Sequence, residues 1–195
     1  MTSVTVPAPR GGYSGSVLHL DIDPTEHQRR RSLQRRHIDD PSVLDLLMTL
    51  PVGALVAYRD LTTGQQDAVR RAPTGVLDFV TPWADDLRVS RLAVRPCRVS
   101  MATVRSATAC KTALESASRF APFCARQVIV RRRPKLAETL IEFDFWGVGL
   151  LLEHGDGGTE TLVAPTPWRP MRHTVAGWRF AENAYAAYLT HNSAA

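Results

Sequence analysis

The hydrophobic side chains of this chain recur with two different periods, and the period changes repeatedly along its 195 residues. Alternating apolar and polar residues are typical of strands, whereas apolar residues three or four positions apart are typical of helices. Strand-like patterns cover residues 17–23, 54–58, 76–80, 87–94, 97–104, 123–131, 136–146, 150–153 and 160–164, and helical patterns cover 24–37, 41–50, 65–71, 106–121 and 176–189. Short elements in this mixed order predict an α+β fold with a largely antiparallel sheet, rather than regular βαβ alternation.

We expect one globular domain over residues 41–190, with a central helix at 106–121 and a C-terminal helix at 176–189. Residues 1–40 are expected to form a flexible basic arm that contains a short strand and an arginine-rich helix. The first 16 residues combine small residues, proline and glycine with few large apolar groups, which favours flexibility. The longest apolar runs are far shorter than the ~20 residues that a membrane span requires.

The arginine-rich segment that follows Asp23 predicts a helix without an apolar face. Asp23 is placed to cap this helix, Pro24 suits its first turn, and Glu26 can complete a capping box. Residues 27–37 then contain five arginines and one large apolar side chain, Leu33. Because core packing cannot hold such a helix, we expect it to be exposed, partly disordered or ordered by a partner.

The charge of the chain is concentrated in one segment. The whole protein has a net charge of +5, but residues 88–135 carry ten Arg and two Lys against Glu115 alone, a net charge of +11. The flanking segments 41–87 and 136–195 carry −3 and −4. A basic block of this kind favours a polyanionic partner, most commonly a nucleic acid. The alternative is that the block pairs internally with its acidic flanks, for example with Glu138, Glu142 and Asp144.

The leading hypothesis is therefore a protein that binds an anionic partner, most plausibly nucleic acid, through the 88–135 segment and the arginine-rich helix. Arginine forks bind phosphate groups in a bidentate manner. The candidate residues are Arg29, Arg30, Arg31, Arg35 and Arg36 in the helix, and Arg98, Arg126, Arg131, Arg132, Arg133 and Lys135 in the basic segment. The last four are expected to lie in a loop between two strands.

Two other classes of function remain open. The first is an enzyme or ligand-binding domain whose arginines hold a phosphorylated or carboxylated small molecule, in a pocket where they meet His173 or His154. Trp168, in a proline-rich crossing, could line a ligand groove or cover a sheet edge. The second is a protein-interaction subunit that docks an acidic partner. Phe143, Phe145 and Trp146 suit either a stacking platform for single strands or core packing.

No motif in the sequence names a reaction, so enzymatic activity is undecided, and we predict no metal or cofactor. His19, Asp21 and Asp23 share one face of a predicted strand, where they could act as metal ligands or general acids and bases; we favour a polar outer face. The three cysteines have no CxxC spacing, which favours reduced, mostly buried thiols in a cytoplasm. Arginine makes up 22 of the 24 cations, a bias that a GC-rich, bacterial-type genome explains.

Overall fold

The computed structural model describes residues 2–8, 15–34, 37–82, 86–170 and 172–193 of the chain. In these ranges the helices are α1 (Pro24–Ser32), α2 (Pro41–Thr49), the 3-10 helix η1 (Tyr58–Asp60), α3 (Thr63–Arg71), α4 (Lys111–Ser118), α5 (Ala137–Phe145) and α6 (Val175–Ser193). The strands are β1 (Thr2–Pro7), β2 (Ser16–Ile22), β3 (Val56–Ala57), β4 (Leu77–Val80), β5 (Arg88–Arg91), β6 (Cys97–Thr108), β7 (Ala125–Arg132), β8 (Gly149–Glu153) and β9 (Thr159–Val163). This mixture confirms the predicted α+β class. No helix within the described ranges is long and apolar enough to cross a membrane.

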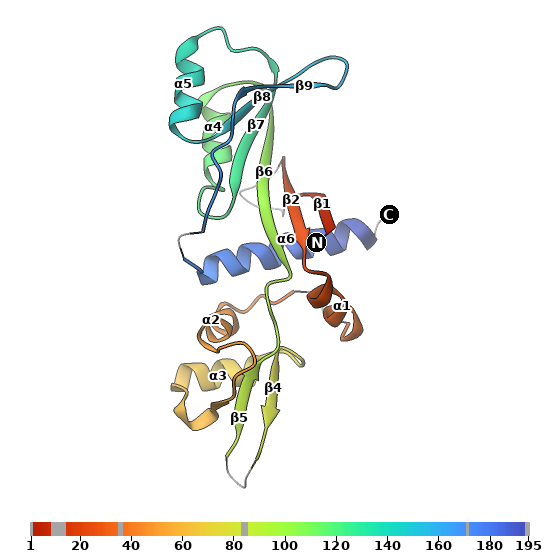
Figure 1. Ribbon diagram of the computed structural model, residues 1–195, viewed down its shortest axis with the longest axis vertical. Coiled ribbons are helices and arrows are strands. Elements are labelled where there is room, and N and C mark those ends of the chain that lie inside the picture. Colours follow the sequence, from red (N-terminus) through yellow and green to blue (C-terminus); the bar gives the residue numbers. More distant parts are fainter. Residues whose placement is uncertain (1, 9–14, 35–36, 83–85, 171, 194–195) are drawn as a thin grey trace.

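Six strands form the main sheet, in the order β1-β2-β6-β7-β8-β9 (Figure 1). Its outer pairs β1–β2, β2–β6 and β8–β9 are antiparallel, whereas β6–β7 and β7–β8 are parallel. Parallel neighbours require a crossover connection, and α4 and α5 supply the two crossovers. Most strand pairs in the protein are antiparallel, as expected, but the centre of the main sheet follows a βαβ alternation that we did not expect.

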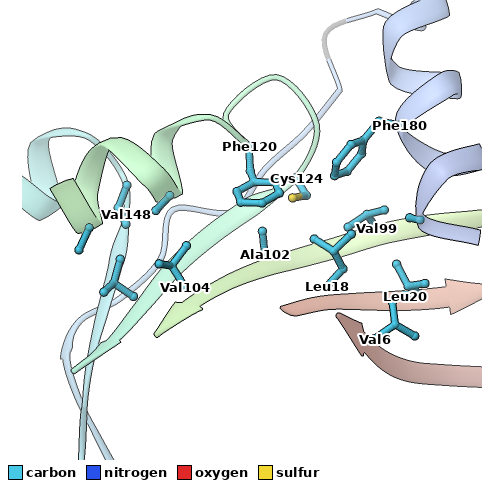
Figure 2. Close-up of a cluster of buried hydrophobic side chains, with 14 of the residues drawn as sticks. Val6, Leu18, Leu20, Val99, Ala102, Val104, Phe120, Cys124, Val148 and Phe180 are labelled. Carbon is cyan, nitrogen blue, oxygen red and sulfur yellow. The ribbon is translucent and has the colours of Figure 1, made fainter. Parts of the chain in front are cut away.

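One hydrophobic core lies between the main sheet and helices α4, α5 and α6 (Figure 2). Leu18, Leu20 and Ile22 of β2 are buried in this core, which confirms the alternation predicted for this strand. On the helical side, Phe120 follows α4 and Phe180 belongs to α6, and their ring centroids lie 6.1 Å apart. The helices therefore cover one face of the sheet with apolar side chains drawn from the whole length of the chain.

A second, smaller core joins the antiparallel sheet β3-β5-β4 to helices α2 and α3. Leu44 and Leu47 of α2 are fully buried against Val89 of β5 and its neighbours. Trp178 of α6 belongs to this second core, whereas Phe180, two residues later, belongs to the first. Helix α6 therefore connects the two cores, and in Figure 1 it crosses between the two sheets.

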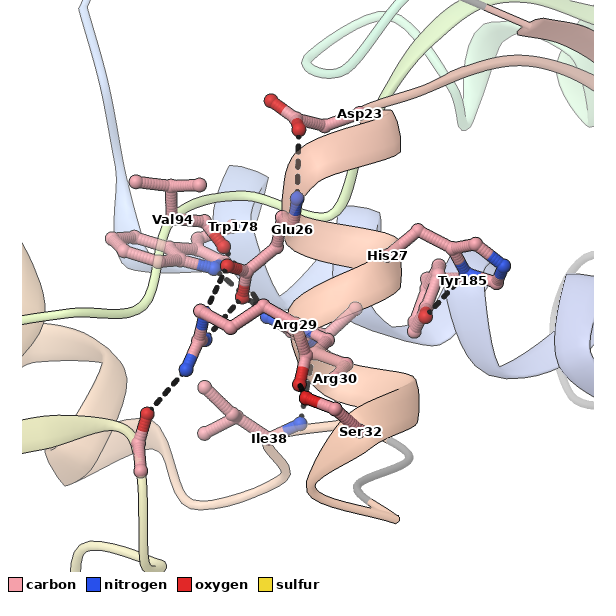
Figure 3. Close-up of polar contacts among 12 residues, drawn as sticks. Asp23, Glu26, His27, Arg29, Arg30, Ser32, Ile38, Val94, Trp178 and Tyr185 are labelled. Atoms are coloured by element: carbon pink, nitrogen blue, oxygen red, sulfur yellow. Dashed lines mark hydrogen bonds and ion pairs between the residues drawn. The ribbon is translucent and has the colours of Figure 1, made fainter.

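Helix α1 is held by buried ion pairs, so the expectation that it is exposed, partly disordered or ordered by a partner is wrong (Figure 3). The Arg30 side chain is 1% exposed and contacts Glu26 of its own helix and Glu182 of α6, each at 2.7 Å. Glu26 also accepts hydrogen bonds from Arg29, and Glu182 accepts one from the indole N–H of Trp178 at 3.0 Å. Ion pairs and hydrogen bonds therefore hold this helix in place of the apolar packing that it lacks. We call these five residues the arginine–glutamate cluster.

Residues 136–146 form helix α5, which corrects the strand predicted there. Phe143 is buried and Leu140 is half-buried. These two residues are three positions apart, so both side chains lie on the side of the helix that faces the core. Ile141 and Phe145, whose alternation with polar residues suggested a strand, point to solvent instead. The physical reason is the parallel pairing of β7 with β8, because a chain that must return to the start of a parallel strand needs a long crossover.

The central helix starts later than predicted. Strand β6 continues through Ser106 to Thr108 because this part of it pairs with β7, as in Ser106↔Val130 and Thr108↔Arg132. The N-cap residue of α4 is therefore Cys110 rather than Ser106. Cys110 is exposed, which corrects the expectation of a buried thiol, whereas Cys97 and Cys124 are buried as expected.

The N-terminal residues 2–7, which the sequence assigns to a flexible arm, form strand β1. The strand pairs with β2 along its whole length, from Thr2↔Ile22 to Pro7↔Val17. Residues 9–14, which also belong to the expected arm, lie outside the described residues. This first strand extends the main sheet and packs against α6.

Candidate anion-binding site

A cavity of about 370 Å³ opens beside the end of β2 and the start of β6. Its other walls come from the segment after α4, the crossing that leads to α6, and the first turns of α6. The residues that line it are Asp21, Asp23, Arg95, Cys97, Arg98, Val99, Pro122, Phe123, Trp168, Pro170, Arg172, His173, Thr174, Gly177, Phe180 and Ala181. We call it the arginine pocket.

Three arginines and a histidine converge on this pocket from separate parts of the chain. Arg95 precedes β6, Arg98 lies within it, and Arg172 and His173 come from the crossing just before α6. Within the described residues, none of the three guanidinium groups has an ion pair or a hydrogen bond. The pocket therefore has an excess of positive charge, because its three arginines outnumber the two carboxylates that line it, Asp21 and Asp23.

Arg95 is the most informative of these residues because it is half-buried. Its guanidinium lies over the ring of Trp178, 5.8 Å from the ring centroid, and Arg91 lies over the same ring at 5.3 Å. Burial, together with the like charge of Arg91, lowers the pKa of Arg95. A guanidinium that is withdrawn from water without an acceptor is a costly arrangement, which an anion in the pocket would relieve.

The N-terminus of helix α6 adds to the positive potential. Thr174 caps the helix: its hydroxyl accepts from Gly177 N at 3.0 Å, and its carbonyl accepts from Trp178 N at 3.0 Å. The other N–H groups of the first turn have no acceptor within the helix, and the helix dipole places partial positive charge there. Because Thr174 and Gly177 line the pocket, this end of α6 faces the same cavity as the arginines.

The remaining walls are apolar and aromatic. The rings of Phe123 and Phe180 are stacked, with centroids 4.4 Å apart and an interplanar angle of 14°. Trp168 is fixed in place because its indole N–H donates to the carbonyl of Ala121 at 3.1 Å. The pocket therefore offers a flat apolar surface next to its cationic side, which is the composition of many small-molecule sites.

The other reactive groups of the pocket are engaged in the fold. Burial raises the pKa of the Cys97 thiol to about 12, so this thiol stays protonated and donates to the carbonyl of Ala181 at 3.3 Å. Asp23 caps α1 through Glu26 N at 2.9 Å, and Asp21 accepts from the Ser3 hydroxyl at 2.7 Å. These contacts favour binding over covalent chemistry at this site.

The triplet of His19, Asp21 and Asp23 does not form a cluster of ligands. His19 Nε2 lies 2.9 Å from the Thr103 hydroxyl on the polar face of the sheet, and burial lowers the pKa of this imidazole. Gln127 of β7 donates to the same hydroxyl at 2.9 Å. In the part of the chain that the structure describes, no three His, Cys, Asp or Glu side chains are grouped so that they could hold a metal ion.

Of the nine candidate residues that the structure describes, only Arg98 lines the pocket. Arg29 and Arg30 belong to the arginine–glutamate cluster, and Arg31 is exposed on α1. Arg35 and Arg36 lie outside the described residues. The arginine-rich helix therefore uses two of its arginines to hold the fold together.

The candidates in the second half of the basic segment are distributed over the surface. Arg126 is half-buried and donates to the carbonyl of Trp146 at 2.8 Å, and burial lowers its pKa. Arg131 and Arg132 are the last residues of β7 rather than loop residues, and Arg133 with Lys135 follows them; all four are exposed.

Much of the basic segment pairs with acidic side chains. The ion pairs are Arg88–Asp86, Arg105–Glu153, Lys111–Glu115, Arg131–Glu153 and Arg133–Glu160. Hydrogen bonding and charge from Arg105, followed by Arg131, lower the pKa of Glu153. The acidic partners come largely from β8 and β9, and not from Glu138, Glu142 and Asp144, which were the examples given for internal pairing.

Besides Arg98, sequence reasoning named Trp168 and His173 as possible binding residues of this pocket, and it missed others. Trp168 was a candidate for a ligand groove and His173 for a site where arginines converge, and both line the cavity, whereas His154 lies in the β8–β9 turn, 3.6 Å from Glu160. Arg95 and Arg172 were missed. The available signal for Arg172 was local, because this residue lies four positions before the predicted start of the last helix at residue 176, close to the end at which helices bind anions.

Comparison with known proteins adds nothing to this geometry, because no protein-family description, characterised protein or solved structure matches this chain.

Proposed function

We propose that the arginine pocket binds a small molecule that carries a phosphate or carboxylate group next to a flat apolar part. The observation that carries the proposal is Arg95, a half-buried guanidinium without an acceptor among the described residues, in a cavity that Arg98 and Arg172 also line. Charge-assisted hydrogen bonds from guanidinium to oxyanion are about twice as strong as neutral ones. The anionic group would lie between these arginines and the N-terminus of α6.

The size and composition of the pocket support a small ligand. A cavity of about 370 Å³ is at the lower end of the range of roughly 300–1,000 Å³ found for small-molecule sites. Phe123 and Trp168 supply aromatic surface for a ring or another flat group, and neither needs to move to expose it. An inorganic anion alone would leave this surface unused.

Nucleic-acid binding through the basic segment stays a prediction with less support. At least five of its cations are paired with carboxylates of the same chain, which reduces the charge that remains for phosphates. Arg31, Arg98, Arg132 and Lys135 are the exposed cations of the candidate set without an ion pair among the described residues. They are the residues through which a polyanion would bind if it bound here.

Thermal unfolding at constant ionic strength tests the ligand proposal. Phenyl phosphate combines an anion with a ring, inorganic phosphate supplies the anion alone, and benzyl alcohol supplies the ring alone. We expect phenyl phosphate to raise the Tm most, because a ligand that binds only the folded state stabilises it by mass action. Arg95→Met and Arg172→Met should abolish the increase, whereas Arg132→Met should leave it intact. Equal responses to all three compounds, or none, would refute the proposal.

A salt series separates the nucleic-acid prediction from the ligand proposal. Fluorescence anisotropy with labelled single-stranded and duplex oligonucleotides would show an affinity that falls steeply as salt rises if phosphates are bound. In that case Arg132→Met and Lys135→Met should weaken binding, and Arg95→Met should not. The two sets of variants therefore assign any anion binding to one surface or the other.

A further inference from the structure

Helix α5 presents large apolar side chains to solvent. Ile141 is 67% exposed, Phe145 79% and Trp146 54%, and Leu136 just before the helix is 64% exposed. Ile141 and Phe145 are four residues apart and therefore lie on one stripe of the helix. The rings of Phe145 and Trp146 meet edge to face, with centroids 5.4 Å apart. Apolar patches of this kind are uncommon on soluble monomers and mark interaction sites.

These exposed side chains are not needed to fold the helix. The opposite side of α5 carries Phe143, which is 1% exposed, and Leu140, and these two side chains pack into the main core. Folding alone therefore leaves no reason for large apolar residues at positions 141, 145 and 146. Serine or threonine would satisfy the same solvent-facing positions at lower risk of aggregation.

The helix is also fixed in position, so the patch is preformed. Gly147 ends it with a φ of +64°, and a side chain there would meet the Thr166 hydroxyl at 2.9 Å. The N–H of Val148 donates to the carbonyl of Phe143 at 2.9 Å, and Arg126 donates to the carbonyl of Trp146 at 2.8 Å. A partner would therefore meet an ordered surface and lose little of its affinity to the ordering of α5.

The charged side chains of α5 itself are all acidic, whereas Lys135 precedes the helix and Arg126 lies at its C-terminal end. Glu138, Glu142 and Asp144 are exposed on the same helix, and among the described residues none of them forms an ion pair. Most acidic side chains of β8 and β9 are paired with arginines, which makes the unpaired acids of α5 distinctive. Complementary charge steers partners and suppresses wrong ones, so an acidic rim favours a basic partner.

We propose that the exposed face of α5 docks a protein partner through a basic amphipathic helix of that partner. Apolar side chains of the partner would contact Ile141, Phe145 and Trp146, while its lysines or arginines would contact Glu142 and the other acids. A second copy of this chain is disfavoured because pairing α5 with itself would bring like charges together. The site is separate from the arginine pocket, since no residue of α5 lines that cavity.

Binding of two designed peptides to the full-length protein tests this proposal. One peptide is a 20-residue helix with leucines along one face and lysines along the other; its control has the same composition in scrambled order. We expect the ordered peptide to bind at least tenfold more tightly by fluorescence anisotropy. Ile141→Ser combined with Phe145→Ser should reduce that affinity at least tenfold, because buried aromatic anchors dominate interfaces. Glu142→Gln should weaken it less and lower its dependence on salt.

The control variant is Phe79→Ser, which removes an exposed phenylalanine in the smaller sheet and should leave peptide affinity unchanged. Circular dichroism would show that the variants keep the fold. Equal binding of the ordered and scrambled peptides, or unchanged binding by the Ile141→Ser, Phe145→Ser double variant, would overturn the proposal. So would a wild-type dimer in light scattering that the double variant converts to a monomer, because the occupant would then be a second copy.

Discussion

Arg30 and Arg95 each contact a side chain of helix α6, but their environments are opposite. Arg30 is 1% exposed, and its guanidinium contacts Glu26, Glu182 at 2.7 and 2.9 Å, and the carbonyl of Val94 at 3.2 Å. Arg95 is half-buried over the ring of Trp178 and has no acceptor among the described residues. Trp178 is shared, because its N–H donates to Glu182 while its face lies against Arg95.

The difference separates an arginine that holds the fold from one that is available to a ligand. Burial alone would lower the pKa of Arg30, but hydrogen bonds and charge from Glu182 and Glu26 raise it above its ordinary value. For Arg95, burial and the like charge of Arg91 lower the pKa. The cation of the cluster is thus stabilised inside the protein, whereas that of the pocket is destabilised by burial and by the charge of Arg91.

Substitution of Arg30 in the arginine–glutamate cluster should have the largest effect on the free energy of unfolding. Arg30→Met keeps the volume of the side chain but leaves Glu182 and Glu26 without their shared partner in a buried site. Breaking a buried pair in this way costs about 3–5 kcal/mol of the free energy of unfolding, measurable by urea titration. Arg31→Met, on the exposed side of the same helix, should change it by less than about 0.5 kcal/mol. A loss below about 1 kcal/mol for Arg30→Met would mean that the cluster does not hold α1.

Substitution of Trp178, which contacts both Glu182 of the cluster and Arg95 of the pocket, should have the next largest effect on the free energy of unfolding. Trp178→Phe removes the hydrogen bond to the Glu182 carboxylate but keeps an aromatic face under Arg95. Loss of a hydrogen bond to a charged group costs about 2 kcal/mol. Trp168→Phe is the matched control, because its N–H donates to a neutral carbonyl, that of Ala121, and should cost about 1 kcal/mol. Equal losses for the two variants would show that the charge of Glu182 contributes nothing.

Sensitivity to acid should depend on His27 of helix α1, the helix that the arginine–glutamate cluster holds. Burial, followed by the charge of Arg31, lowers the pKa of His27, whose Nδ1 lies 2.9 Å from the Tyr185 hydroxyl. The unfolded chain therefore takes up this proton first as the pH falls through about 6.5, and the free energy of unfolding decreases. His27→Asn should flatten the decrease between pH 7 and pH 5.5 in urea titrations. An unchanged profile for His27→Asn would contradict the assignment.

Local patterns predicted much of this fold, and the errors have a common cause. The alternation of β2 and the cap of α1 by Asp23 were correct because both depend on neighbours in sequence. The strand expected at 136–146 became α5, and the helix expected from Ser106 began after β6. Both errors arise from the parallel pairing of β7 with its neighbours, since pairing between distant segments decides how far a strand continues and where a crossover is needed.

The candidate site was harder to predict for the same reason. The net charge of +11 shows how many cations residues 88–135 carry, but it could not show that Glu153 and Glu160 lie beside Arg105, Arg131 and Arg133. An arginine that pairs and one that stays unpaired look identical in the sequence. The difference depends on which carboxylates the sheet brings into reach.

The pocket arginine should have the smallest effect on stability and the clearest effect on binding. Arg95→Met retains a flexible apolar chain over Trp178 and removes the repulsion with Arg91, so we expect the free energy of unfolding to change by less than about 1 kcal/mol. The same variant should lose the stabilisation that phenyl phosphate gives the wild-type protein. Arg95→Met would then reduce ligand binding without reducing stability, whereas Arg30→Met would reduce stability. A loss of more than about 2 kcal/mol in urea would instead place Arg95 among the residues that hold the fold, and the pocket would lose its one half-buried, unsatisfied cation.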